Sequence, residues 1–188
     1  PIYTRYTNPV TTILAAPGDI QVHLIGSGSS ESEARVVVEE LSRQIEAELG
    51  DRVYSREGES LEEVVGKLLE ARAATLAVAE SCTGGLLAER ITSVPGSSSY
   101  FRGAWVTYSG QSKVDWLGVS AETIASDGAV SAEVARQMAQ GVRRLASSAL
   151  GAAVTCSLKY AMKARVLEEG VSRGAPPAFF SVLLFWFL

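Results

Sequence analysis

Hydrophobic residues recur at two spacings along the chain, and each spacing predicts a different kind of element. In the segment 19–25 every second residue is apolar, the pattern of a half-buried strand with His23 on its polar side. Ser30 is a predicted helix N-cap, and the apolar residues after it recur at helical spacing up to Gly50. We therefore predict a small α+β domain at residues 1–57.

From Ser60 onward, segments with helical spacing alternate with short runs that are almost wholly apolar. Such runs are typical of parallel strands buried on both faces, so we predict a three-layer α/β/α sandwich with a largely parallel sheet at 58–155. The runs end at Ser81, Tyr108 and Thr155. Because ligands bind beyond the carboxyl ends of parallel strands, these three residues mark the expected crevice.

Composition excludes several classes of protein. A net charge of −4 and a pI near 5.2 argue against a nucleic-acid-binding surface. The apolar end at 179–188 is about half the length that a membrane span requires, and no signal peptide is visible, so we expect a cytoplasmic protein without a membrane partner. Because the chain starts at Pro1, we expect it to be a fragment of something longer.

Few side chains are available for metal or imidazole chemistry. Two cysteines cannot build a disulfide framework or a four-cysteine zinc site, and no metal-ligand spacing is present. With His23 as the single histidine, a Ser–His–Asp triad would need a residue far away in the sequence. We expect neither a metal nor a cofactor.

The turn after the first buried strand of the second domain concentrates reactive groups. Ser81 leaves that strand and precedes a helix, and Gly84 and Gly85 let a substrate approach the backbone. The turn fits an anion site or an oxyanion hole. Alternatively, Ser81 and Thr83 only cap the helix. Glu80 either orients a lysine or the substrate, or closes the turn by accepting backbone hydrogen bonds.

A nucleophilic serine without histidine needs another base, and a desolvated lysine can serve. Lys113 follows the second strand end, and the Tyr108 phenol could relay a proton or hold its ammonium. The alternative reading makes Lys113 an exposed lysine at a helix start, and the residues alone favour it. Cys82 is a rival nucleophile because helix N-termini lower thiol pKa values, unless its side chain points into the core.

Four segments resemble one known family. They are "LAVAESCTGG", "VPGSSSYFRGAWVTYSGQSKVDWLGV", "GAVSAEVARQMAQGVRRL" and "GAAVT". They resemble the C-terminal domain of the CinA (competence/damage-inducible) proteins, a nicotinamide mononucleotide (NMN) deamidase. The segment before Ser60 is similar to the family's KH-like middle domain, but it has no basic G-x-x-G loop, so we expect no RNA binding.

The resemblance implies roles for single residues. Ser81 would be the nucleophile, Lys113 the base, Tyr108 its assistant, and Thr155 would help to stabilise the oxyanion. The substrate would lie against the turn, whose members are Glu80, Cys82, Thr83, Gly84 and Gly85. The product would be nicotinate mononucleotide with release of ammonia, and the family implies a homo-oligomer.

The chain departs from the family pattern after Thr155. Cys156 stands where glycine is expected, no glycine-rich stretch follows, and residues 156–188 match nothing recognisable. We expect this departure to impair the nucleotide pocket. Two alternatives therefore stand beside a serine deamidase: a non-catalytic nucleotide-binding or oligomerisation module, and an amidase that depends on Cys82.

Overall fold

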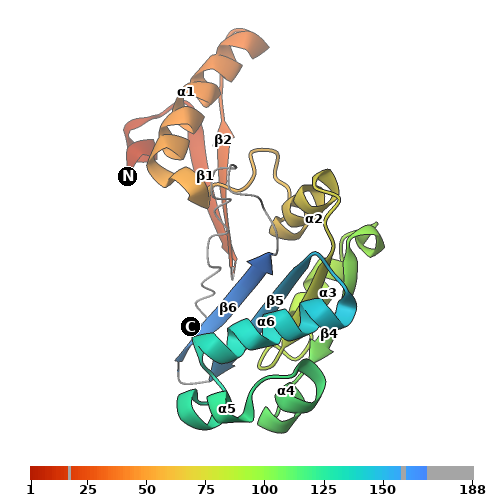
Figure 1. The fold of residues 1–188 in the computed structure, drawn as a ribbon. Helices are drawn as coiled ribbons and strands as arrows, with labels where there is room; N and C mark the ends of the chain where they lie inside the picture. The colour runs from red at the N-terminus through yellow and green to blue at the C-terminus, as the bar shows by residue number, and fades with distance from the viewer. Residues whose placement is uncertain (17, 158–159, 169–188) are drawn as a thin grey trace, which may run out of the picture. The chain divides into compact units, whose positions relative to one another are not determined.

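The chain divides into two compact units, one ending at Glu59 and one beginning at Ser60 (Figure 1). The computed structural model describes residues 1–16, 18–157 and 160–168. The apolar segment 179–188 lies outside the described residues. No helix in the described part of the chain is long and apolar enough to cross a membrane.

The first unit is a hairpin with one long helix. Its elements are η1 (Ile2–Arg5), β1 (Val10–Ala16), β2 (Asp19–Ile25), α1 (Glu31–Leu49) and η2 (Gly50–Arg52), and β1 pairs antiparallel with β2. The Ser30 side chain caps α1 by accepting the Glu33 backbone N–H, as the sequence predicts. The expectation of a half-buried β2 is wrong for Ile20 and Val22, which are 68% and 37% exposed. Two strands and one helix offer too little surface to cover a whole strand face.

The second unit is built on a four-stranded sheet in the order β4-β3-β5-β6. Strand β3 pairs parallel with both β4 and β5, while β6 pairs antiparallel with β5, so the prediction of a largely parallel sheet is confirmed. Its elements in chain order are α2 (Leu61–Ala71), β3 (Leu76–Glu80), α3 (Leu86–Thr92), η3 (Ser97–Ser99), β4 (Phe101–Val106), α4 (Gly110–Leu117), α5 (Ala121–Asp127), α6 (Ala132–Ala146), β5 (Leu150–Ser157) and β6 (Tyr160–Glu168).

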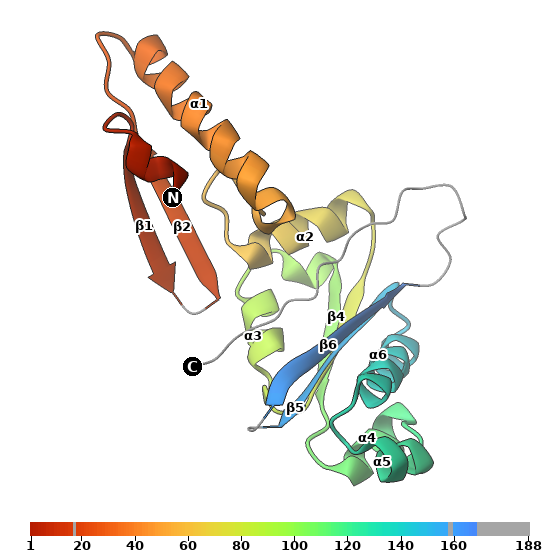
Figure 2. The same cartoon turned by 90° about the vertical axis from the view of Figure 1, so that its left-hand side faces the viewer.

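Helices cover both faces of this sheet, which confirms the three-layer arrangement (Figure 2). Successive residues of β3 point to opposite faces, and all five are buried. Ala77 and Ala79 join a core cluster with α4 and α6, while Leu76 and Val78 join a second cluster with α2 and α3. The same alternation will direct the side chains that follow β3.

Helix α6 lies against α4 and against strand β5 at distances that only glycine permits. A Cβ at Gly141 would lie 2.1 Å from the Leu117 carbonyl oxygen, and one at Gly151 would lie 2.2 Å from that of Ala139. Val134, Met138 and Val142 of this helix are buried, whereas Leu145 is 52% exposed. Leu145 lies in the last turn of α6, where the next residue, Ala146, packs against the core cluster in its place.

Two elements were not expected. Helix α5 fills a segment that the hydrophobic pattern leaves unassigned, and its Ile124 packs against the α4–α6 cluster. Strand β6 adds residues 160–168, which match no family motif, to the edge of the sheet beside β5.

Candidate active site

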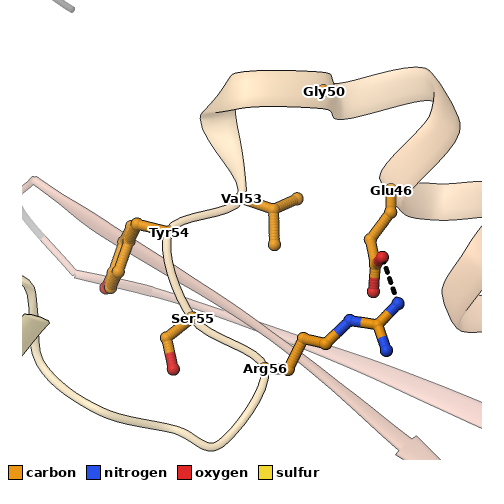
Figure 3. A pocket seen from close by; sticks show the side chains of 6 residues that line it. All are labelled: Glu46, Gly50, Val53, Tyr54, Ser55 and Arg56. Atoms are coloured by element: carbon orange, nitrogen blue, oxygen red, sulfur yellow. Dashed lines mark hydrogen bonds and ion pairs between the residues drawn. The ribbon is translucent and has the colours of Figure 1, made fainter. Parts of the chain in front are cut away.

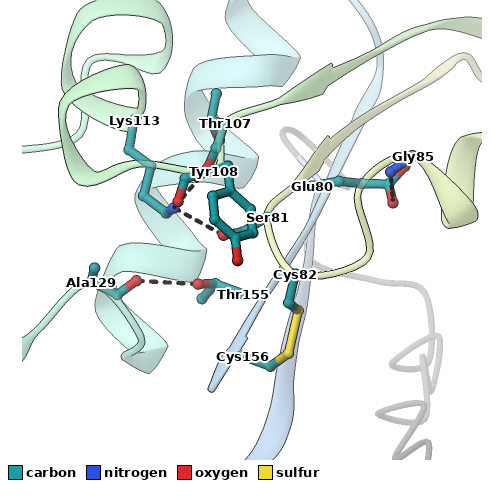
Figure 4. The surroundings of a disulfide bond; sticks show 10 residues. All are labelled: Glu80, Ser81, Cys82, Gly85, Thr107, Tyr108, Lys113, Ala129, Thr155 and Cys156. Atoms are coloured by element: carbon teal, nitrogen blue, oxygen red, sulfur yellow. Dashed lines mark hydrogen bonds between the residues drawn. A yellow bond between two sulfur atoms is a disulfide. The ribbon is translucent and has the colours of Figure 1, made fainter. Parts of the chain in front are cut away.

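Three side chains meet at the carboxyl ends of the parallel strands (Figure 4). Ser81 follows β3 and lies two residues after Ala79, while Thr155 lies two residues after Ala153 in β5. Because side chains alternate along a strand, both are directed to the face that α4 and α6 cover. Helix α4 begins four residues after β4 ends, and it places Lys113 beside Ser81.

Lys113 is buried rather than exposed. Its side chain is 1% accessible, and its Nζ lies 3.0 Å from Ser81 Oγ, 2.7 Å from the Thr107 carbonyl oxygen and 3.3 Å from that of Tyr108. The reading of Lys113 as an exposed helix-start lysine is therefore wrong. Burial disfavours the ammonium form and so lowers the pKa of Lys113.

These three contacts suit an ammonium, which would donate to all three oxygens, and they also suit a neutral amine. An uncharged lysine has two N–H donors and one lone pair, and two of its neighbours are carbonyl oxygens that can only accept. When the two N–H groups donate to Thr107 and Tyr108, the lone pair is left for the Ser81 hydroxyl. In that state Lys113 can take the serine proton, which is the geometry a general base requires.

Glu80 closes the turn that carries Ser81. Its side chain is fully buried, and its two carboxylate oxygens accept the backbone N–H groups of Gly85, Leu87 and Ala88 at 2.9–3.1 Å. Of its alternative roles, the structure supports closing the turn, since both oxygens are occupied and directed away from Lys113 (Figure 4). Glu80 thereby fixes the backbone on which the nucleophile sits.

The turn leaves two backbone donors unused. The Ser81 N–H donates to the Val154 carbonyl and the Gly84 N–H to the Ser81 carbonyl, at 3.0 and 3.1 Å. Within the described part of the chain, the N–H groups of Cys82 and Thr83 have no acceptor. Gly84 and Gly85 have φ values of 60° and 112°, in the left-handed region that favours glycine. The donor next to Ser81 is suited to bind an oxyanion formed on a substrate carbonyl.

Thr155 and Tyr108 are placed differently from each other. Thr155 is fully buried, and its hydroxyl donates to the Ala129 carbonyl at 3.1 Å. Tyr108 is 77% exposed, and it is its backbone carbonyl, not its phenol, that contacts Lys113. The contribution of the phenol to catalysis stays a prediction.

Cys82 is bonded to Cys156, which was not foreseen from the sequence. The two Cα atoms are 5.8 Å apart, and the bond joins the residue after Ser81 to the residue after Thr155 (Figure 4). Cys82 is exposed rather than directed into the core, and Cys156 is half-buried. Because a disulfide has no thiolate, Cys82 is not a nucleophile in this state.

Other partners in the site were also missed. Thr107 supplies the nearest acceptor for Lys113 through its backbone carbonyl, a role that any residue type can fill and that leaves no signal in a sequence. Its hydroxyl and that of Thr83 are buried without a partner among the described residues. Thr83 was among the predicted turn residues, and for Thr107 a hydroxyl at a strand end was the only signal in the sequence.

The first unit has a pocket of its own, of about 340 Å³ (Figure 3). Glu46 and Arg56 form an ion pair at its wall. The lining residues are Glu46, Gly50, Val53, Tyr54, Ser55 and Arg56. It holds no pair comparable to Ser81 and Lys113. Across the described ranges, no cluster of three or more His, Cys, Asp or Glu side chains could hold a metal ion.

Comparison with known proteins agrees with this architecture. A CinA-like protein of Solibacter usitatus is 54% identical over 155 residues, which cover 82% of this chain and 37% of that protein. The crystal structure of the competence/damage inducible protein CihA from Agrobacterium tumefaciens matches with a TM-score of 0.51 at 34% identity, over 58% of this chain and 76% of that one. A CinA superfamily protein from Escherichia coli matches with a TM-score of 0.51 at 25% identity, over 59% and 76%.

The chain thus spans 37% of the length of the curated relative with which it shares 54% identity. The family profile described as the CinA C-terminal domain matches residues 58–157, which contain Ser81, Lys113 and Thr155. Since this match covers more than half of the chain, the protein belongs to the CinA C-terminal domain family.

Proposed function

We propose that the second unit is an amidohydrolase that converts NMN to nicotinate mononucleotide and ammonia. The observation that carries this proposal is the buried Ser81–Lys113 pair, with 3.0 Å between Oγ and Nζ. A lysine buried to 1% exposure beside a serine is costly for stability, and desolvation gives it the lowered pKa that a base needs.

In the first step, Ser81 Oγ attacks the carboxamide carbon while its proton passes to the lone pair of Lys113. The carbonyl oxygen becomes an oxyanion, to which the N–H group of Cys82, without an acceptor among the described residues, would donate. Thr155 supports this edge of the crevice from β5, and its hydroxyl is tied to the Ala129 carbonyl.

In the second step the carbon–nitrogen bond breaks. Lys113, now protonated, donates its proton to the leaving nitrogen, so ammonia departs and an acyl ester on Ser81 remains. Water then attacks the ester carbonyl while Lys113 takes its proton. Lys113 passes that proton to Ser81 Oγ as the ester bond breaks, so the carboxylate product leaves and both Ser81 and Lys113 return to their starting states. No step requires a metal or a cofactor.

The proposal is tested by ammonia release from NMN, in the presence of a chelator, by the parent chain and two variants. Ser81→Ala removes the nucleophile, and we expect release to fall by at least about 10³-fold. Ser148→Ala is the matched control, because Ser148 is also buried but lies before β5, at the opposite end of the strand from Thr155. Its activity should equal that of the parent.

Circular dichroism establishes that each protein is folded. A folded parent that releases no ammonia contradicts the proposal and favours a non-catalytic nucleotide-binding or oligomerisation module. Equal release by the parent and Ser81→Ala contradicts the assignment of the nucleophile.

A further inference from the structure

The Cys82–Cys156 bond crosses the edge of the crevice at the point where the hydrogen-bonded ladder ends. The paired register of β3 and β5 ends at Glu80 and Val154, with one further bond from the Ser81 N–H to the Val154 carbonyl at 3.0 Å. Beyond that bond, the turn leaves the sheet. The disulfide is therefore the next connection between the turn and β5 after the last hydrogen bond.

Each cysteine of this bond directly follows a residue of the candidate site. Cys82 follows the nucleophile and carries the backbone N–H that faces no acceptor in the described chain, and Cys156 follows Thr155. On the other side of the turn, the Glu80 carboxylate holds Gly85, Leu87 and Ala88, but it contacts neither Cys82 nor Thr83. The peptide unit that carries the Cys82 N–H is held by one hydrogen bond, from the Gly84 N–H to the Ser81 carbonyl, and the disulfide is the connection that ties this turn to β5 beyond the ladder.

The bond is also open to reagents. Cys82 is exposed, and a Cβ added at Gly84 would meet no heavy atom of the described residues within 4 Å, so none of them covers this side of the turn. Exposed disulfides are the ones that exchange readily with small thiols. Half-buried Cys156 is the less accessible sulfur, so attack is expected at Cys82.

We propose that Cys82 and Cys156 form a thiol–disulfide exchange site for low-molecular-weight thiols and disulfides, and that its oxidised state holds the Ser81 turn in the competent position. A thiolate attacks Cys82 Sγ, the sulfur–sulfur bond breaks, and Cys156 leaves as a thiolate that takes up a proton. A second thiol then resolves the mixed disulfide, so the two reagent thiols are oxidised to a disulfide as the protein gains two electrons and two protons. A small disulfide reverses both steps.

The effect on activity rests on the proposed function. When the bond is reduced, the Ser81–Lys113 pair keeps its hydrogen bond, because α4 and β4 hold Lys113 independently of Cys156. The oxyanion donor loses its tether, and a small displacement of a catalytic donor costs about 10- to 100-fold in rate. We expect kcat to fall by that factor, with little change in KM, because the donor acts mainly in the transition state.

The experiment equilibrates the full chain with glutathione at a series of thiol-to-disulfide ratios. Peptide mapping measures the fraction of Cys82 bonded to Cys156, amide hydrogen exchange reports on Ser81 and Gly84, and ammonia release from NMN gives kcat and KM. Cys156→Ser, which cannot form the bond, is the matched variant. Reduction should speed exchange and lower kcat in the parent only, and the variant should behave like the reduced parent at the reducing ratios, where peptide mapping shows no glutathione on Cys82.

Three results would overturn the inference: no change in the bonded fraction across the series, exchange that is the same in both states, or a variant that responds to glutathione as the parent does. Failure of the proposed function would give a different set of results. If reduction breaks the bond and speeds exchange but neither state releases ammonia, the deamidase is refuted and the exchange site stands.

Discussion

Replacement of Lys113 by methionine should remove activity while changing the stability of the fold only slightly. Methionine keeps the apolar stem but removes Nζ, so the Thr107 and Tyr108 carbonyls and the Ser81 hydroxyl each lose a partner. Unpaired buried groups of this kind cost about 1–3 kcal/mol. In the opposite direction, methionine removes the cost of desolvating the Lys113 amine, about 1–3 kcal/mol for a buried polar group. We expect a net change within about 2 kcal/mol at neutral pH.

The difference in stability between the parent and Lys113→Met should change with pH in a definite direction. Burial lowers the pKa of Lys113 below the 10.5 of a free lysine, so between these two values the unfolded chain binds more protons than the folded chain. The free energy of unfolding contributed by Lys113 therefore rises with pH in that window, by at most about 1.4 kcal/mol per pH unit. The methionine variant lacks this contribution, so it loses stability relative to the parent as the pH rises.

The assay is urea unfolding followed by circular dichroism from about pH 7 to about pH 10, with ammonia release from NMN measured on the same samples. Arg102→Met, at an exposed cation of β4, is the control and should follow the parent at every pH. Loss of the base should lower ammonia release by at least about 10²–10⁴-fold. The reasoning fails if all three proteins share one pH profile of stability, or if Lys113→Met retains the parent's activity.

Three further predictions concern stability and are measured by urea unfolding. Glu80→Gln turns an amide NH₂ toward backbone donors and should lower the free energy of unfolding by about 2–3 kcal/mol. Its control, Glu89→Gln on the exposed side of α3, should change the free energy of unfolding by less than about 0.5 kcal/mol. Equal effects of the two substitutions would contradict the role of Glu80. Gly141→Ala places a Cβ 2.1 Å from a carbonyl oxygen of α4 and should cost about 1–3 kcal/mol. Gly110→Ala is the control, because a Cβ there would lie 3.7 Å from its nearest neighbour, and it should change the free energy of unfolding by less than about 1 kcal/mol. A Gly141→Ala variant as stable as the parent would refute the close approach of α6 to α4. Ser131→Ala removes the cap of α6 and should cost about 1 kcal/mol; no loss would mean that the cap contributes nothing.

Local chemistry alone determined much of the second unit. Ser60 and Glu63 form a capping box at the start of α2, and Ser131 caps α6. Such caps involve residues three positions apart, so the sequence contains both partners. The apolar run before Ser81 became a strand with all five residues buried, because only a sheet covered on both faces can bury so continuous a run.

Tertiary structure decided what Lys113, Cys82 and Thr107 do. The spacing around Lys113 is the same for an exposed lysine and for a base; the difference is the desolvation imposed by helices that pack over the sheet. Cys82 and Cys156 are 74 residues apart in the sequence, and only the parallel pairing of β3 with β5 brings their Cα atoms to 5.8 Å. The burial of Lys113 and the closeness of the two cysteines result from the packing of segments that are distant in the sequence. A pattern within one segment therefore cannot predict them.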